Sequence, residues 1–465
     1  MRYTVSSAVR QVPMILLAFL ALATSPCAAD EAIRPDHPDT SGQPAMVYEG
    51  QDLFPLIAEH VHGSTIVELP NGDLLVAWFQ GSGERWADDV RIMGTRLRAG
   101  TGRWSRPFLM ADTPGFPDIN PILFMDAKDR LWLMWYTVIA NQWETSLLKY
   151  RLSEDYSNQA EAPRWTWQDV LHVKPGDPAE RGIQPGDRFV RSIERQVEEY
   201  ATYLKEGIYA LRPGEAAVAD GLWNAWGKRM LSKARGEDMV AKGVLREPSE
   251  RMTDKDLGYP YFRRMGWQTK NKAVLVDGRR LIVPLYSDGF SFSLMAITDD
   301  GGQIWQFSEP LVAAGNIQPS IARRADGTLV AYMRDNGPAP KRLHISTSQD
   351  KGLNWSPVRD CDLPNPGSGA DIVTLHNGHW VLAYNDTEEG RESLAVSLST
   401  DEGRTWSHTK HLELGIPHAF KISSAYPSII QGADGTLHAV YSYHHSYSGK
   451  TIKYAKFTES WLAVK

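Results

Sequence analysis

A short apolar strand that follows a tight turn recurs six times along the chain. The turns begin at Asn71, Asp129, Asp277, Asp326, Asn377 and Asp434, and each is followed by an apolar run rich in aromatic residues. In most copies the first turn residue precedes Gly, a pair that supplies the positive φ angles of a tight hairpin. Apart from one long gap, the copies lie roughly 50 residues apart, the length of one four-stranded propeller blade.

A second repeated motif reads Ser/Thr-x-Asp-x-Gly-x-x-Trp. Its copies span residues 298–305, 348–355 and 399–406. The Asp side chain is suited to cap backbone N–H groups, Gly to take the left-handed conformation, and Trp to anchor the hairpin to its blade. This motif matches the Asp box of sialidase-like propellers. Together the two repeats predict an all-β fold, a six-bladed β-propeller, although they describe the fold and not its chemistry.

The long gap between repeats contains an insertion, at about residues 178–262, that breaks the strand pattern. Residues 191–205 have helical spacing, with Ile193, Val197, Tyr200 and Leu204 on one face. Residues 216–234 show a similar pattern. We predict a helical insertion that either decorates the surface or shapes a binding pocket.

The N-terminus has the pattern of an export signal. Arg2 and Arg10 flank the start of an apolar run over residues 12–22, and small residues offer a cleavage site near Ala28 or Ala29. The run is too short for a membrane span. We therefore predict a signal peptide at 1–29, a polar linker at 30–54 and the propeller at 55–465, in an exported protein of the periplasm or the extracellular space. Lipid attachment at Cys27 is the less favoured alternative, because the residues before it fit a lipidation signal poorly.

Charge and composition exclude several classes of protein. The net charge is −6, and removing residues 1–29 takes away two arginines and no acid, which makes it −8. A nucleic-acid partner is therefore not expected. After removal of residues 1–29, Cys361 would be the only cysteine, so the fold does not rest on an internal disulfide. The histidines lack metal-ligand spacing, and we expect neither a metal nor a cofactor. The 16 tryptophans suit both blade packing and stacking against sugar rings.

From about residue 55 to the end, the chain resembles the sialidase-like, Asp-box repeat family. This resemblance implies an enzyme that removes a sugar bearing a carboxylate at its anomeric carbon. Sialidases use a tyrosine nucleophile, the exception among glycosidases. The family pairs this tyrosine with a glutamate, supplies an aspartate as acid/base, and clamps the carboxylate with three arginines. Arginine suits the clamp because its planar fork meets a carboxylate bidentately.

Three residues match the motifs of that family. Tyr426, within Ala-Tyr-Pro-Ser-Ile-Ile, lies where the family has its nucleophile; the alternative is a core tyrosine. Arg334 ends the strand that follows Asp326-Gly327, where the family has a clamp arginine. Arg391 precedes the strand that leads into the last Asp box, and it is the other clamp candidate.

Two departures from the family pattern affect the chemistry. The first clamp arginine is absent, and its place holds the segment of residues 60–67, in which His62 could serve as a shorter donor or as a general base. The family glutamate is replaced by Gln318, and a neutral amide cannot accept the phenol proton. The acid/base is expected in the loop of residues 80–91, where Glu84, Asp88 and Asp89 are the candidates and Asp89 has a structural alternative.

Further polar residues near strand ends are predicted to line the same face, although a hydrogen-bonded turn is the simpler role for each alone. They are Asn120, Asn271, Lys272, Tyr286, Asp288 and Asn365.

Three functions remain open on this basis, all with an acidic glycan as the partner. The first is a secreted, sialidase-like glycoside hydrolase acting on a terminal carboxylate-bearing sugar. The second is a polysaccharide lyase or hydrolase for uronic acids, with His62 as base and Tyr426 as acid. The third is a glycan-binding propeller without catalysis, which Gln318 supports.

Overall fold

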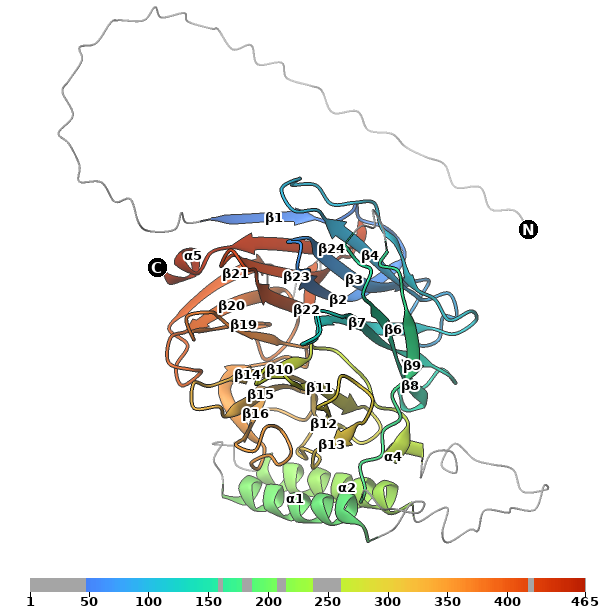
Figure 1. Cartoon of the computed structure of the whole chain (residues 1–465). Coiled ribbons are helices and arrows are strands. Elements are labelled where there is room, and N and C mark those ends of the chain that lie inside the picture. Colours follow the sequence, from blue (N-terminus) through green and yellow to red (C-terminus); the bar gives the residue numbers. More distant parts are fainter. Residues whose placement is uncertain are drawn as a thin grey trace, which may run out of the picture. The chain divides into compact units, whose positions relative to one another are not determined.

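The computed structural model forms a ring of six four-stranded antiparallel sheets (Figure 1). It describes residues 47–157, 162–177, 186–206, 215–236, 261–416 and 422–464, all of which lie in one compact unit. The predicted all-β, six-bladed propeller is confirmed. The predicted signal peptide, with Cys27, lies outside the described residues.

Within each of the first three blades, the strands follow one another along the chain. Blade one contains β2 (His60–Glu68), β3 (Leu74–Gly81), β4 (Arg91–Leu97) and β5 (Phe108–Ala111). Blade two contains β6 (Asp118–Met125), β7 (Leu131–Val138), β8 (Ser146–Ser153) and β9 (Trp167–Val170), with the short helix η1 (Trp143–Thr145) before β8. Blade three contains β10 (Val274–Val276), β11 (Arg280–Ser287), β12 (Phe292–Thr298) and β13 (Gln306–Phe307).

The last three blades follow the same order until the ring closes. Blade four contains β14 (Asn316–Arg323), β15 (Leu329–Asp335), β16 (Arg342–Ser348) and β17 (Arg359–Pro364). Blade five contains β18 (Asp371–Thr374), β19 (Trp380–Tyr384), β20 (Ser393–Ser399) and β21 (His408–Leu414). Blade six contains β22 (Ile422–Gln431), β23 (Leu437–His445) and β24 (Gly449–Phe457), and the helix α5 (Glu459–Ala463) follows it.

Blade six takes its fourth strand from the other end of the chain. β1 (Tyr48–Asp52) pairs antiparallel with β24, from Tyr48 opposite Phe457 to Asp52 opposite Lys453. These residues fall in the stretch predicted to be a linker, so the propeller begins before residue 55. All five residues of β1 are exposed, and an edge strand of this kind carries no hydrophobic alternation from which it could have been predicted.

The Asp boxes form hairpins of the expected kind. Asp300 Oδ1 accepts the backbone N–H groups of Gln303 and Ile304, at 2.9 and 3.0 Å. Gly302 has φ +93°, and a Cβ there would lie 2.5 Å from the ring of Trp132 in blade two. Glycine therefore permits both the turn and its close packing against the preceding blade.

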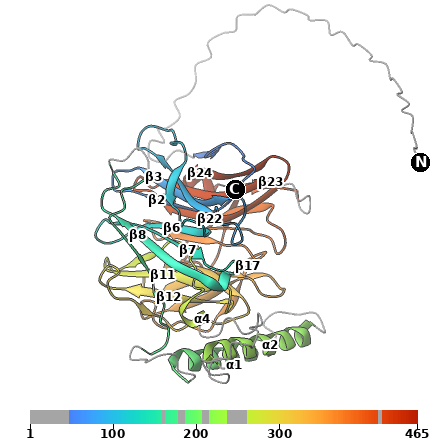
Figure 2. The same ribbon diagram turned by 90° about the vertical axis from the view of Figure 1, so that its right-hand side faces the viewer.

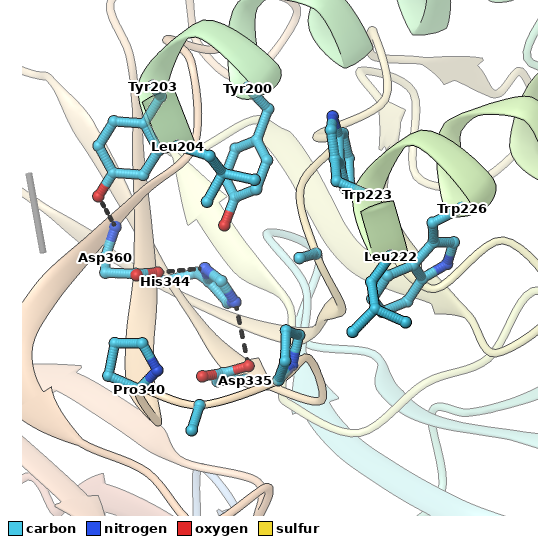
Figure 3. Close-up of a pocket in the computed structure, with 13 residues that line it drawn as sticks. Tyr200, Tyr203, Leu204, Leu222, Trp223, Trp226, Asp335, Pro340, His344 and Asp360 are labelled. Carbon is cyan, nitrogen blue, oxygen red and sulfur yellow. Dashed lines mark hydrogen bonds and ion pairs between the residues drawn. The ribbon is translucent and has the colours of Figure 1, made fainter. Parts of the chain in front are cut away.

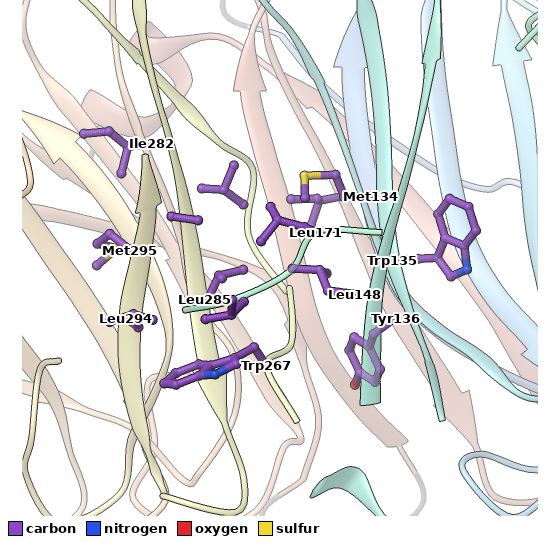
Figure 4. Close-up of a cluster of buried hydrophobic side chains, with 14 of the residues drawn as sticks. Met134, Trp135, Tyr136, Leu148, Leu171, Trp267, Ile282, Leu285, Leu294 and Met295 are labelled. Atoms are coloured by element: carbon purple, nitrogen blue, oxygen red, sulfur yellow. The ribbon is translucent and has the colours of Figure 1, made fainter. Parts of the chain in front are cut away.

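Neighbouring blades are held together by apolar side chains that interlock between their faces (Figure 4). Met134 and Leu148 of blade two share one buried cluster with Ile282, Leu285 and Met295 of blade three. The central strands are covered on both faces, which is why their sequences read as continuous apolar runs.

The insertion between β9 and β10 contains helices, as predicted. They are α1 (Arg188–Lys205), α2 (Glu215–Arg235) and α4 (Tyr261–Arg264). Figure 2 shows α1 and α2 along one edge of the propeller, below β11 and β12. Gln196 of α1 bonds the chain before blade four: its Nε2 donates to the Pro310 carbonyl at 2.7 Å, and its Oε1 accepts the Val312 N–H at 2.9 Å. None of the described helices has the length and hydrophobicity needed to cross a bilayer.

Candidate active site

Four innermost strands share a β-bulge at the same level of the ring. The register shifts between His62 and Thr65 in β2, and at the matching places in β6, β14 and β22. The residues at these bulges have positive φ: Gly63 (+64°), Asn120 (+46°), Gln318 (+56°) and Tyr426 (+55°). A bulge redirects a side chain, and positive φ in non-glycine residues is uncommon and often found at functional sites.

The bulges direct Asn120, Gln318 and Tyr426 to one pocket of about 400 Å³. Every blade contributes to its lining. The lining residues are His62, Phe79, Glu84, Ile119, Asn120, Tyr136, Trp143, Tyr286, Asp288, Gln318, Arg334, Asn336, Arg391 and Tyr426.

The phenol oxygen of Tyr426 lies at the centre of a hydrogen-bond network. It accepts a bond of 3.0 Å from Gln318 Nε2 and one of 2.9 Å from Arg334 Nη1. Arg334 Nη2 also donates to Asn336 Oδ1, at 3.0 Å. Among the described residues, no carboxylate is hydrogen-bonded to the phenol oxygen. The structure thus brings Tyr426, Arg334 and Gln318 together, and Gln318 is positioned to donate to the phenol.

Two further cations surround Tyr426. The Arg391 guanidinium carbon lies 5.7 Å from the Tyr426 ring centroid, and its Nη2 donates to the Gly367 carbonyl at 2.7 Å. The Lys270 ammonium lies 5.5 Å from the same ring and donates to the Pro427 carbonyl at 2.9 Å. Burial lowers the pKa of Arg391, and it lowers that of Lys270 to about 8. The poorly solvated positive charges favour binding of an anion.

His62 packs directly on Tyr426, with ring centroids 4.2 Å apart and planes inclined at 30°. Desolvation, followed by the nearby His60 and Arg391, lowers the pKa of His62 well below its ordinary value. Its imidazole is therefore neutral at pH 7 and keeps a free lone pair, while the lowered pKa makes it a weak base.

The three carboxylates predicted as acid/base candidates lie in different places. Glu84 lines the pocket, 3.1 Å from His60 Nε2. Burial raises its pKa, but the contact with His60 and the charges of Lys450 and Arg85 outweigh this effect and lower it. Asp88 and Asp89 are exposed and do not line the pocket. Asp89 accepts the Ser82 N–H at 3.0 Å and so stabilises the loop.

Asp288 is the carboxyl group best suited to hold a proton in this pocket. Desolvation raises its pKa to about 6, although the positive charge of Arg334 opposes the rise. The sequence pattern placed Asp288 on the lining but gave no sign of this shift, which depends on how tightly the surrounding blades enclose the carboxyl group.

The other predicted lining residues divide into two groups. Asn120 lines the pocket, where its Nδ2 donates to Tyr136 Oη at 3.1 Å and to Tyr286 Oη at 3.3 Å. In contrast, Asn271, Lys272 and Asn365 do not line it. Asn271 Nδ2 bonds the Gln318 and Pro319 carbonyls, Lys272 forms an ion pair with Asp371, and Asn365 Oδ1 accepts backbone N–H groups of its own loop. These polar groups are used to hold backbone segments in place.

Sequence reasoning did not identify Phe79, Ile119, Tyr136, Trp143 or Asn336 as lining residues. A signal existed for the site as a whole: Asn120, Gln318 and Tyr426 each precede Pro in an inner strand, as Asn-Pro, Gln-Pro and Tyr-Pro. In the described part of the chain, no group of three or more His, Cys, Asp or Glu side chains is arranged to hold a metal ion.

These features define a six-bladed β-propeller with a polar pocket, lined by two arginines and two carboxyl groups, to which every blade contributes. The chain belongs to the BNR repeat-like domain family, whose model matches residues 72–179 and 242–439, more than half of the sequence. Its fold is that of the sialidase-like propellers. No curated protein matches the sequence significantly.

Several solved structures share the fold at low sequence identity. A protein of unknown function from Dyadobacter fermentans is 12% identical with a TM-score of 0.58, and the match covers 89% of this chain and 98% of that one. The NanB sialidase from Streptococcus pneumoniae is 12% identical with a TM-score of 0.57, covering 89% and 71%. The leech intramolecular trans-sialidase is 13% identical with a TM-score of 0.57, also covering 89% and 71%.

Proposed function

We propose that this chain is a glycoside hydrolase that removes a terminal sugar bearing a carboxylate. One observation carries the proposal: Arg334 and Arg391, from different blades, flank Tyr426 of a third blade at one pocket. Two guanidinium groups are suited to hold a carboxylate while the phenol faces the adjacent carbon. The fold shared with proteins named as sialidases supports the same substrate class.

In this proposal, Asp288 is the general acid and Tyr426 the nucleophile. The carboxyl proton of Asp288 passes to the leaving glycosidic oxygen as that C–O bond breaks. A bond forms between Tyr426 Oη and the anomeric carbon, and the phenol proton passes to neutral His62. Water then attacks the anomeric carbon and gives a proton to the Asp288 carboxylate, while the bond between that carbon and Tyr426 Oη breaks and His62 returns its proton to the phenolate. An uncharged phenol approaches an anionic sugar without the repulsion that a carboxylate nucleophile would meet.

A lyase acting on uronic acids is the second candidate, and the pairing of His62 with Tyr426 favours it. The neutral imidazole packs on a phenol to which no carboxylate bonds among the described residues. His62 would remove the proton next to the sugar carboxylate, whose developing charge the arginines stabilise. Tyr426 would protonate the leaving oxygen, and a C=C bond would form in the sugar.

A substrate screen separates these candidates. The purified protein is incubated with sialosides, uronosides and neutral galactosides of the same linkage, and each reaction is assayed for free sugar and for unsaturated product absorbing in the ultraviolet. Release of free acidic sugar supports the hydrolase, whereas ultraviolet absorbance supports the lyase. Tight binding of an acidic glycan without either product would support a glycan-binding propeller. Preference for the neutral galactosides would contradict a carboxylate-bearing substrate.

We also propose that the protein is exported after cleavage near Ala28 or Ala29. The support is the basic, apolar and small-residue order of the N-terminus. Mass spectrometry of the protein recovered from the medium or periplasm would give the cleavage site. Recovery of a full-length chain from the cytoplasm alone would contradict export.

A further inference from the structure

A small cavity of about 40 Å³ lies between the helical insertion and blade four (Figure 3). Tyr200 and Tyr203 of α1 and Trp223 of α2 line one side of it. The opposite side contains Asp335, His344 and Asp360, three ionisable side chains of blade four. None of these residues lines the candidate active site, yet Asp335 stands between Arg334 and Asn336 in the sequence, and both of those residues do.

Asp335 holds the loop that follows Arg334. Its carboxylate accepts the Gly337 N–H at 2.7 Å through Oδ1 and the Arg342 N–H at 3.0 Å through Oδ2. Successive side chains of a strand point to opposite faces, so Asp335 turns toward the cavity while its neighbours turn toward the pocket. Fixing Asp335 therefore fixes the backbone from which Arg334 and Asn336 project.

His344 forms ion pairs with two carboxylates (Figure 3). Its Nε2 lies 3.4 Å from Asp335 Oδ1, and its Nδ1 lies 2.8 Å from Asp360 Oδ1. The imidazole is only 3% exposed. Burial alone would lower the pKa of His344, but the two carboxylates outweigh it and raise the pKa to about 10. His344 is thus a cation at neutral pH, and it joins two anions that would otherwise repel each other.

Asp360 connects this group to the insertion. Its backbone N–H donates to Tyr203 Oη at 3.3 Å, and the guanidinium carbon of its neighbour Arg359 lies 4.3 Å from the Tyr203 ring centroid. α1 is itself bonded to the propeller through Gln196. A continuous series of contacts therefore leads from α1, through Asp360, His344 and Asp335, to the pocket.

We propose that His344 is a positioning residue, which holds Asp335 so that Arg334 and Asn336 are presented to the carboxylate of the sugar. The helical insertion then belongs to the binding site as its support. This inference rests on the proposed function, because it assumes an acidic ligand at Arg334. His344, a buried side chain that takes no part in the catalytic steps, thereby has a role in binding.

The test compares acidic sugars with their methyl esters. The probes are free N-acetylneuraminic acid and D-glucuronic acid, each with its ester, and binding is measured by calorimetry for the wild type, His344→Gln and Tyr203→Phe. His438→Gln is the matched control, since His438 is also buried but bonds Tyr454 in blade six, outside the pocket. His344→Gln is expected to weaken binding of the acid about 10-fold or more, in line with the loss of one charge-assisted hydrogen bond to the sugar carboxylate. Binding of the ester should be nearly unchanged.

The outcomes separate the two proposals. If the wild type binds neither acid more tightly than its ester, the proposed substrate class fails, and the role of His344 fails with it. If the wild type binds the acid more tightly than the ester and His344→Gln keeps the same ratio of the two affinities, only the positioning role is overturned. Should His344→Gln fail to fold, Tyr203→Phe provides the test. A ratio of acid affinity to ester affinity that is several-fold smaller than in the wild type supports the positioning role of His344, and an unchanged ratio overturns it.

Discussion

Arg334 Nη1 donates a hydrogen bond of 2.9 Å to Tyr426 Oη, although the two residues are 92 positions apart in the sequence. Arg334 is the second-to-last residue of β15 in blade four, and Tyr426 occupies the bulge of β22 in blade six. Only closure of the ring brings these strands to a common centre. The pocket therefore forms only when all the blades have closed into the ring.

Replacing Tyr426 with Phe should remove turnover and retain binding. The change deletes one oxygen that both the hydrolase and the lyase require, while the ring against His62 stays in place. We expect kcat to fall by about 10²-fold or more, with the affinity for the acidic product within a few-fold of wild type. Steady-state kinetics and calorimetry check the two parts. Tyr447→Phe, at a position 83% exposed, is the control, and turnover retained by Tyr426→Phe would rule out both catalytic roles.

Replacing Arg391 with Ala should selectively weaken the binding of acidic substrates. The partly buried guanidinium is poorly solvated, so its attraction for a carboxylate is stronger than that of a surface arginine. We expect KM for the acid to rise about 10- to 100-fold and KM for the methyl ester to change little. The exposed Arg404→Ala is the matched control. An equal rise for acid and ester would assign Arg391 to general packing.

The pH dependence of activity should reflect the ionisation of the Asp288 carboxyl group. Burial raises its pKa to about 6, so the carboxyl group is protonated below that pH and loses its proton above it. As a general acid, Asp288 would make activity decline as the pH rises through about 6. Asp288→Asn should remove this decline, and its loss of rate should be smallest for aryl glycosides, whose leaving group needs little protonation. Asp89→Asn should leave the profile as it is in the wild type.

The contribution of His344 to stability should depend on pH in one direction. Its pKa is about 10 in the folded state, against an ordinary value near 6.5. Its stabilising effect is therefore complete below pH 6.5 and is lost as the pH rises through about 10. Urea unfolding midpoints of the wild type and His344→Gln should converge between pH 6.5 and 10. The pKa of His438 is lowered to about 4, so His438→Gln should show no such convergence in that range.

Replacing Gln318 with Glu should separate the hydrolase from the lyase. Gln318 Nε2 donates to Tyr426 Oη, whereas a carboxylate of the same length could accept the phenol proton. If Tyr426 is a nucleophile, we expect kcat for hydrolysis to rise. KM should rise as well, because the added negative charge repels an acidic sugar. If Tyr426 instead donates a proton in elimination, the same change should slow formation of the unsaturated product.

The fold was predictable because its signals are local and repeated. The turn before each apolar strand, such as that of Asp326 and Gly327, and the three Asp boxes each define a hairpin within a few residues. The six copies of the turn and strand define the ring. The amphipathic spacing of residues 191–205 likewise predicted α1. β1 was missed for the opposite reason, since all its residues are exposed and its partner lies at the far end of the chain.

The site was predictable only in part. Motif resemblance indicated Tyr426, Arg334 and Gln318, and the structure brings them together at one pocket. The raised pKa of Asp288 could not be read from the sequence, because it arises from atoms contributed by several blades. The same applies to Asn271, a polar residue near a strand that looks like a ligand-binding group until its backbone partners are known.

The pairing of β1 with β24 has a consequence for biosynthesis. Residues 48–52 leave the ribosome about 400 residues before their partners at 453–457, since a chain is made from its N-terminus. Until the last strand emerges, the first has no sheet to join, and blade six cannot be completed. The candidate active site at the centre of the ring is thus completed only at the end of synthesis. A chain truncated before β24 should therefore lack a working site, even if its earlier blades have formed.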